Sequence, residues 1–421
     1  MYMDTILLLV SLMAVVIQGS PYRRVCYFTN WSRWRQGIGK FTVYDVEPFL
    51  CTHIVYAFGT FDSSGKVKPL NQGPDEKDWA ALSKMKQINK NLKLLLALGG
   101  WNFGSVRFSN MAANPTVRSK FIYNAVDFLR KYDFDGLDID WEYPTARGGV
   151  AADKANLVTL CKELIDAFND DATKRGKDRL LLTAAVPANP KTAERGYDVM
   201  ALSKYFDFIN LMTYDFHGGW DGKTGFNSPL YAAPHDPNPT FNMDAAAKWW
   251  HGAGCPKDKI IVGFATYGRS FTLRDPSESG VGAPASTGPA GPYTRGQGFW
   301  AYYEICQSIE KGGQVIFDDD QKVPYYLKDT LWIGYDNEHS FTVKANWLKE
   351  NGYSGVMFWA LDLDDFSNAC TTSTRTYPLI KTVIDILDGA MPVRTISTQV
   401  EPTDTTAADT QQDETLTVTD Y

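Results

Sequence analysis

The chain has 421 residues, with 42 Lys and Arg against 49 Asp and Glu, so its formal charge is −7. This balance does not supply the extended basic surface that nucleic acid requires, and we expect no nucleic-acid partner. The apolar fraction of 44% and the charged fraction of 22% are typical of a globular protein with a sizeable core. The aromatic fraction of 14% is high, and we expect some of these rings to face a ligand.

Residues 1–20 are predicted to be a secretory signal peptide. The apolar run from Ile6 to Ile17 is shorter than the ~20 residues that span a bilayer, and the small residues Gly19 and Ser20 follow it. Asp4 precedes the run without a Lys or Arg, which leaves a short membrane anchor as the alternative. We therefore expect a secreted, extracellular protein with no membrane contact after signal cleavage.

After this segment, short β-branched or apolar runs alternate with helical patterns. The strand candidates are 24–29, 53–58, 92–98, 136–140, 180–186, 208–213, 260–264 and 355–359. A helical signal lies between most of them, for example over 115–132. Strands separated by helices pair in parallel through right-handed crossovers, and eight such units close into a barrel. The predicted fold is therefore an α/β protein with a (β/α)8 TIM barrel.

The barrel domain is predicted to span 21–390 and to contain an insertion. The stretch 268–336 is rich in Gly, Pro, Tyr and Phe and lacks a helical period, so we expect a small α+β module between strands seven and eight. The stretch 391–421 is rich in Thr, Asp and Gln, a composition that predicts a disordered tail.

Cysteine and histidine spacings disfavour a zinc site. The 6 Cys form no C-x-x-C pair and the 5 His form no H-E-x-x-H motif. In a secreted chain disulfides are expected, although these spacings leave the pairing open. Cys161 lies among leucines at helical spacing, which favours a buried free thiol.

The strongest chemical signal is the sequence from Phe134 to Tyr143. Side chains of a strand alternate between its two faces, so three carboxylates share one face and three apolar side chains share the other. The two sets are Asp138, Asp140 and Glu142, and Leu137, Ile139 and Trp141. Carboxylates about 6 to 7 Å apart in a partly desolvated site raise one another's pKa. One of them can stay protonated near neutral pH and act as a general acid.

The acidic row has two other interpretations. It could lie on the exposed face of a strand, but the apolar residues on the opposite face argue against an exposed strand. It could also bind a divalent metal through its oxygen atoms, in which case a chelator would inactivate the protein. We predict no metal and no other cofactor.

These residues resemble the chitinases of glycoside hydrolase family 18. The family pattern D-G-x-D-x-D-W-E-Y-P stands at 135–144 without a departure. Further matching stretches are 27–31, 56–58, 98–102, 212–218, 263–269 and 355–359. The resemblance covers roughly 22–388 and rests on several motifs in the same order.

The resemblance implies a substrate-assisted, retaining hydrolysis of β-1,4 polymers of N-acetylglucosamine. Glu142 would protonate the leaving glycosidic oxygen and later activate water. Asp140 would hold the acetamido group of the substrate, and Asp138 would share a proton with Asp140. Tyr214 and Asp215 would complete the catalytic set. The implied partner is chitin or a chito-oligosaccharide, and we expect a monomer.

The resemblance also implies which residues bind the sugar chain. The aromatic ones are Tyr27, Trp31, Phe58, Trp101, Tyr143, Trp220, Tyr267 and Trp359, and the others are Gly99, Gly100, Asn102, Met212, Thr213 and Arg269. Trp34, Trp79 and Trp347 are assigned instead to the core or the surface. The implied disulfides are Cys26–Cys51 and Cys306–Cys370, which leave Cys161 and Cys255 as free thiols.

Two other functions share this pattern. A chitinase-like lectin would bind chito-oligosaccharides without cleaving them, and the presence of Glu142 argues for the enzyme. An endo-β-N-acetylglucosaminidase would act on N-glycan cores, and the insertion and the tryptophans argue for a longer polymer. The sequon at Asn30 precedes Trp31. Because Trp31 should face the sugar-binding groove, we do not expect a glycan on Asn30.

Overall fold

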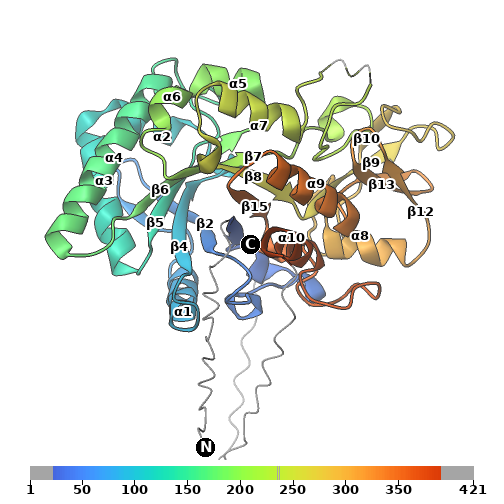
Figure 1. Cartoon of the computed structure of the whole chain (residues 1–421), viewed down its shortest axis with the longest axis horizontal. Helices are drawn as coiled ribbons and strands as arrows, with labels where there is room; N and C mark the ends of the chain where they lie inside the picture. The colour runs from blue at the N-terminus through green and yellow to red at the C-terminus, as the bar shows by residue number, and fades with distance from the viewer. Residues whose placement is uncertain (1–21, 235, 237, 390–421) are drawn as a thin grey trace, which may run out of the picture. The chain divides into compact units, whose positions relative to one another are not determined.

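The computed structural model describes residues 22–234, 236 and 238–389, and the predicted signal peptide and tail lie outside them. At the centre of the described part, parallel strands form a closed barrel (Figure 1). Their order around the barrel is β1-β15-β8-β7-β6-β5-β4-β2, and pairing of β1 with β2 closes the ring. The strands are β1 (Arg23–Thr29), β2 (His53–Phe61), β4 (Lys93–Gly99), β5 (Gly136–Asp140), β6 (Leu181–Pro187), β7 (Phe208–Met212), β8 (Ile260–Ala265) and β15 (Gly355–Trp359).

Each predicted strand segment coincides with one of these strands, with ends that shift by up to three residues. The predicted (β/α)8 TIM barrel is thus confirmed. The short strand β3 (Val67–Pro69) pairs antiparallel with β2 beyond the barrel.

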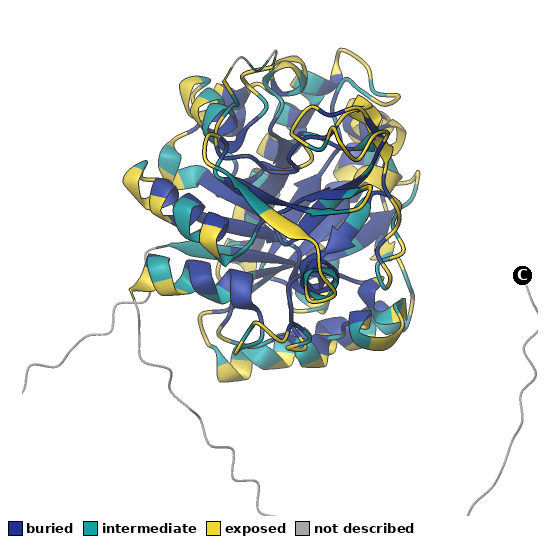
Figure 2. Ribbon diagram, turned by 90° about the vertical axis from the view of Figure 1, so that its right-hand side faces the viewer, coloured by how far each residue is buried: buried dark blue, intermediate teal, exposed yellow. Residues whose placement is uncertain are grey.

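Helices cover the outside of the barrel. They are α1 (Pro74–Ile88), α2 (Val106–Ala113), α3 (Pro115–Lys131), α4 (Asp153–Arg175), α5 (Pro190–Gly196), α6 (Val199–Leu202), α7 (Met243–Gly252), α9 (Glu338–Glu350) and α10 (Pro378–Asp388). Figure 2 shows buried strands inside and helices whose outward residues are exposed. This division follows from the sequence, in which apolar residues repeat at helical spacing on one side only.

Local signals set the ends of these helices. The Asn114 side chain accepts hydrogen bonds from the backbone N–H groups of Thr116 and Val117, and Pro115 occupies the first turn of α3. Helix α4 ends at Arg175, and the next residue, Gly176, has a left-handed φ of 60° that suits glycine.

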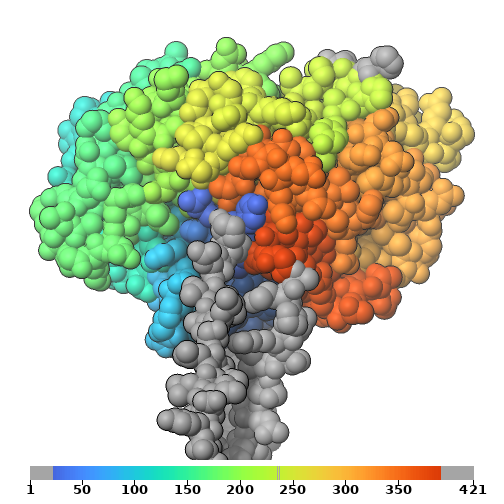
Figure 3. Space-filling model, in the orientation of Figure 1, coloured from blue at the N-terminus to red at the C-terminus, as the bar shows by residue number. Residues whose placement is uncertain are grey.

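The insertion between β8 and β15 is an α+β module, as predicted. Its sheet runs in the order β10-β9-β14-β13-β12, with β11 paired to β9. Its elements are β9 (Tyr267–Leu273), β10 (Ala285–Thr287), β11 (Phe299–Ala301), α8 (Tyr302–Ile309), β12 (Gln314–Asp318), β13 (Val323–Lys328) and β14 (Leu331–Gly334). The module forms the right-hand side of the molecule in Figures 1 and 3, beside α9 and α10. A small core of its own includes Phe271 and Trp332.

The junction between barrel and module is one residue long. Strand β8 ends at Ala265 and β9 begins at Tyr267. The intervening Thr266 donates its N–H to the carbonyl of Trp359 at 3.0 Å and its hydroxyl to the carbonyl of Ala360 at 2.7 Å. The start of the module is therefore hydrogen-bonded to the end of β15.

The structure contains the two disulfides that the resemblance implied, Cys26–Cys51 and Cys306–Cys370. Cys161 and Cys255 are free and buried. Among the described residues, no helix is both long enough and apolar enough to cross a bilayer.

Candidate active site

The acidic row lies at the carboxyl end of β5. Asp138 and Asp140 belong to the strand and are 0% and 2% exposed. The alternation grouped Glu142 with these two residues, and the structure places it two residues beyond the end of β5 at Asp140, as the predicted strand 136–140 implies. Glu142 is also buried, at 9% exposed. All three carboxyl groups are therefore withdrawn from bulk water, at the end of the barrel where active sites of this fold lie.

Asp138 is held by hydroxyl and amide donors from three other strands. Its Oδ2 accepts a hydrogen bond from the Tyr27 hydroxyl at 2.7 Å. Its Oδ1 accepts from the Thr183 hydroxyl at 2.5 Å and from the Asn210 amide at 3.2 Å. Burial raises the pKa of Asp138, while these three donors lower it. The donors thus favour the ionised form of this carboxyl group.

Thr183 and Asn210 were not predicted as site residues. Each is a single polar residue in an apolar stretch of barrel strand, in β6 and in β7. A polar side chain in such a stretch must find a partner inside the barrel, and that rule could have identified both.

Asp140 is the carboxyl group that most strongly resists ionisation. Its pKa is raised well above the ordinary value, first by burial and then by the charges of Glu142 and Asp138. Its Oδ1 is buried and has no hydrogen-bond partner within the described part of the chain. A proton shared between Asp138 and Asp140 is therefore best placed on Asp140.

Glu142 has a pKa of about 7. Burial is the largest cause of this rise, and the charge of Asp215 adds to it. A hydrogen bond from Tyr143 and the charge of Arg147 act in the opposite direction. A glutamic acid with this pKa is about half protonated at neutral pH and mostly protonated in mildly acidic solution, and it can give up its proton in a reaction.

A second polar group lies beyond β7 and on β9. Oδ1 of Asp215 accepts hydrogen bonds from the Tyr267 hydroxyl at 2.7 Å and from Nε and Nη2 of Arg269 at 2.8 and 2.6 Å. The Tyr214 hydroxyl donates to the Met357 sulfur at 3.7 Å. Sulfur is a weak acceptor, so the Tyr214 hydroxyl is available to a stronger one.

Aromatic rings surround the acidic row. The rings of Trp31, Phe58 and Trp359 lie 6.0 to 6.4 Å from one another, and Tyr27 lies 5.2 Å from Trp359. Tyr27 is buried beneath this cluster, whereas Trp31 is 39% exposed. The upper rings can therefore contact a ligand, and Tyr27 acts through its bond to Asp138.

Two further tryptophans are more exposed and each is covered by an arginine. Trp101 is 58% exposed, and the Arg147 guanidinium lies 3.6 Å from its ring centre. Trp220 is 60% exposed, and Arg269 lies 5.1 Å from its ring centre. Large exposed rings are favourable contact surfaces for a ligand with an apolar face.

The predicted residues Gly99 and Gly100 lie against the chain itself. A Cβ atom at Gly99 would lie 1.9 Å from the Asp140 carbonyl oxygen, and one at Gly100 would lie 2.6 Å from the Phe58 ring. Both have positive φ angles, 122° and 84°. These contacts within the protein require glycine at both positions, whether or not a ligand lies nearby.

The other predicted residues differ in accessibility. Thr213 is fully buried and donates its hydroxyl to the Gly263 carbonyl at 2.6 Å, so it joins two strands and presents no surface to a ligand. Asn102 is exposed, while Met212 and Tyr143 are partly buried. Asn30 is buried and donates its amide to Asp75, a position that excludes a glycan in the folded protein.

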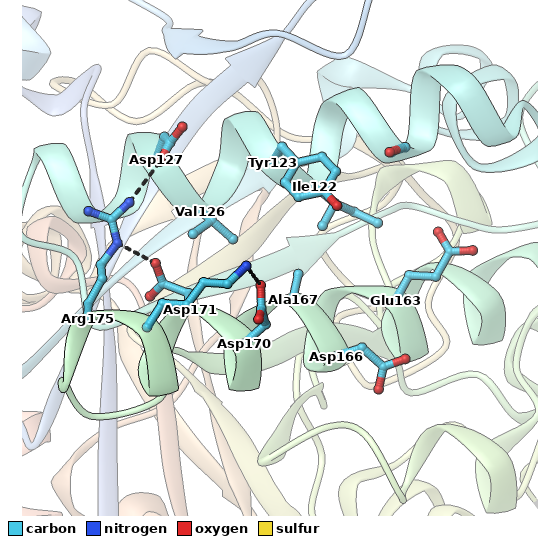
Figure 4. A pocket seen from close by; sticks show the side chains of 12 residues that line it. Ile122, Tyr123, Val126, Asp127, Glu163, Asp166, Ala167, Asp170, Asp171 and Arg175 are labelled. Carbon is cyan, nitrogen blue, oxygen red and sulfur yellow. Dashed lines mark hydrogen bonds and ion pairs between the residues drawn. The ribbon is translucent and has the colours of Figure 1, made fainter.

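Within the described residues, no group of three or more His, Cys, Asp or Glu side chains is placed to hold a metal ion. A groove of about 590 Å³ lies elsewhere, between α3 and α4 (Figure 4). Arg175 bridges Asp127 and Asp171 across it, and Lys174 pairs with Asp170. Its carboxylates are thus engaged in ion pairs on the outer helical layer, away from the acidic row.

Residues 23–364 match the protein family described as glycosyl hydrolases family 18. The chain belongs to glycosyl hydrolase family 18. The family assignment agrees with the resemblance seen in the sequence and with the barrel whose acidic row lies at the carboxyl end of β5.

Relatives within family 18 include proteins described as chitinases and as binding proteins. A Caenorhabditis elegans protein described as a probable endochitinase is 43% identical over 381 residues, which are 88% of this chain and 61% of that protein. The chain therefore spans less than two thirds of that relative. The crystal structure of an immunomodulatory active chitinase from Trichuris suis is 42% identical, covers 87% of this chain and 100% of its own, and has a TM-score of 0.84.

A family 18 structure of the second kind is human YKL-39, described as a pseudo-chitinase with retained chitooligosaccharide binding properties. It is 40% identical, with a TM-score of 0.81, and covers 87% of this chain and 99% of its own. Family 18 and the fold are therefore common to a chitinase and to a pseudo-chitinase, and the site residues must distinguish them.

Proposed function

We propose that the protein is a secreted, monomeric chitinase that hydrolyses internal β-1,4 linkages of N-acetylglucosamine polymers. One observation supports this most: Glu142 is buried and burial raises its pKa to about 7, beside Asp140, whose pKa is raised well above its ordinary value. A binding protein has no need of a proton donor with this pKa, whereas glycoside cleavage requires one.

In the first step, Glu142 would give its proton to the glycosidic oxygen while the bond from that oxygen to the anomeric carbon breaks. The acetamido oxygen of the same sugar would form a bond to the anomeric carbon, which gives a cyclic oxazolinium ion. Asp140 would accept a hydrogen bond from the acetamido N–H, and the Tyr214 hydroxyl would donate one to the acetamido oxygen. Asp138 would take a share of the proton of Asp140 as positive charge develops.

In the second step, the Glu142 carboxylate would accept a proton from water as the water oxygen bonds to the anomeric carbon. The bond between that carbon and the acetamido oxygen would break, so the configuration is retained and Glu142 regains its proton. This substrate-assisted route differs from the scheme with two carboxylates flanking the bond.

The rings would bind the neutral polymer by stacking. Trp359, Trp31 and Phe58 would form the floor, with Trp101 and Trp220 along the groove. Sugar faces carry C–H groups that pack on aromatic surfaces, and such a ligand needs shape and hydrogen bonds more than charge. Asn102, Met212 and Arg269 would add contacts to the sugar.

The deciding experiment is the release of reducing ends from colloidal chitin by the purified protein. We expect turnover by the wild-type chain and a loss of at least ~100-fold for Glu142→Gln, with oligosaccharide binding retained. Binding without turnover in the wild-type chain would overturn the enzyme proposal and favour a lectin, the function consistent with the similarity to YKL-39.

A further inference from the structure

The loop after β4 is attached to the segment that carries Glu142. The Gly100 N–H donates to the carbonyl of Asp140 at 2.8 Å. The hydroxyl of Ser105, a fully buried residue, donates to the carbonyl of Tyr143 at 2.8 Å. The loop is thus held both before and after Glu142, but neither contact involves its exposed ring, Trp101.

Arg147 supplies a contact that includes this ring. Its Nη1 donates to the Glu142 carbonyl at 2.9 Å, and its guanidinium lies 3.6 Å from the centre of the Trp101 ring. One side chain therefore contacts both the backbone of the acid and the exposed indole. Arginine suits this place because its planar group stacks on a ring while its N–H groups donate in the same plane.

We infer that Arg147 is a positioning residue that fixes the position of the Trp101 ring relative to Glu142. The inference rests on the proposed function, in which a sugar stacks on Trp101. A ring that is 58% exposed has few neighbours to fix its plane, and Arg147 covers one face and leaves the other free. The bond to the Glu142 carbonyl then keeps the sugar surface at a constant distance from the acid.

Arg107 provides a matched control. Its guanidinium lies 4.3 Å from the centre of the Phe103 ring, and its Nη1 donates to the Phe61 carbonyl at 3.1 Å. Arg107, at the start of α2, therefore makes the same two kinds of contact, and its ring is not in the proposed sugar-binding set.

The experiment measures the dissociation constant of N-acetylglucosamine hexamer by calorimetry in the Glu142→Gln background. Arg147→Ala should weaken binding about two- to fivefold, the range of a cation–π contact at an exposed site. Arg147→Lys should recover part of the loss, and Arg107→Ala should bind as the background does. In a chain that also carries Trp101→Ala, the effect of Arg147→Ala should vanish. An equal effect with and without Trp101 would overturn the inference.

A second measurement needs no sugar. In protein labelled with 5-fluorotryptophan, the 19F signal of Trp101 is identified by its loss in Trp101→Phe. Arg147→Ala should shift or broaden that signal, and Arg107→Ala should not. An unchanged Trp101 signal would overturn the inference even where the hexamer binds. Failure of the background protein to bind the hexamer, with the signal shifted as expected, would instead overturn the proposed function.

Discussion

The hydroxyl of Tyr27 on β1 donates a hydrogen bond to Oδ2 of Asp138 on β5 at 2.7 Å, and both residues are buried. The two strands are not neighbours in the barrel, so this bond crosses its interior. Together with Thr183 and Asn210, Tyr27 therefore favours the ionised form of Asp138, and the acidic row depends on residues far from it in the sequence.

Tyr27→Phe should lower kcat about tenfold. Loss of one hydrogen bond to a charged group costs ~1.5 kcal/mol, which corresponds to that factor, and the pKa of Asp138 should rise further. The measurement is the initial rate on a chito-oligosaccharide. Tyr56→Phe is the control, because its buried hydroxyl also donates to carboxylates, Asp75 and Asp78. A rate loss as large in Tyr56→Phe would contradict a specific role of Tyr27.

The pH profile of kcat/KM should fall above about pH 7. The pKa of Glu142 is about 7, and the protonated form, present below that pH, is the one that can donate to the glycosidic oxygen. The charge of Asp215 contributes to the raised pKa, so Asp215→Asn should move the alkaline limb to lower pH.

The control for this profile is Asp166→Asn, which removes an exposed carboxylate paired with Lys162 on α4 and should leave the limb in place. A rate that stays constant up to pH 9 would show that Glu142 does not donate a proton in the rate-limiting step.

Tyr214→Phe should reduce kcat about 10²-fold with a smaller change in KM. Its hydroxyl has a weak acceptor, the Met357 sulfur, and one preorganised donor to developing charge contributes an effect of this order. Steady-state kinetics on a short oligosaccharide would measure both constants. Tyr44→Phe, on an exposed residue, should match the wild type. A change confined to KM would indicate that Tyr214 only binds the ground state.

Lys344→Met should destabilise the fold by about 3–5 kcal/mol, the cost of breaking a buried ion pair from one side. Nζ of Lys344 lies 2.5 Å from Oδ1 of Asp336, and both side chains are buried. Urea unfolding would measure the change. Lys248→Met removes an exposed partner of Asp244 and should cost ~0–1 kcal/mol. A similar loss of unfolding free energy in both variants would mean that Asp336 does not need Lys344 as its buried partner.

Thiol labelling in denaturant without reductant should modify two cysteines per chain, Cys161 and Cys255. Burial raises the pKa of Cys255 to about 11, so labelling in the native state should be slow. Mass spectrometry would identify the labelled positions. Label on Cys26, Cys51, Cys306 or Cys370 would contradict the disulfides of the structure.

The barrel could be predicted from the sequence because its signal is local. Each strand is a short apolar run, and the alternation of Asp138, Ile139 and Asp140 identifies the two faces of β5 without knowledge of its neighbours. The predicted end of β5 at Asp140 was also correct, although the alternation that groups Glu142 with Asp138 and Asp140 continues past the last paired residue.

The supporting contacts of the site could not be predicted in the same way. Arg147 on Trp101 and Lys344 beside Asp336 are pairs set by how the loops and helices pack, and neither residue carries a pattern in the sequence. Thr213 illustrates the opposite case. Its place in a family motif predicted a sugar contact, yet its side chain is buried and bonded to the Gly263 carbonyl. Motif position identified the strand end correctly but not the direction of each side chain.

The single residue between β8 and β9 has a further consequence for how a ligand enters. Thr266 is bonded to both Trp359 and Ala360, so this connection offers no hinge about which the module could swing. We therefore expect the module to keep its position when a ligand binds. The backbone of this module should therefore be nearly the same in the free and the ligand-bound protein.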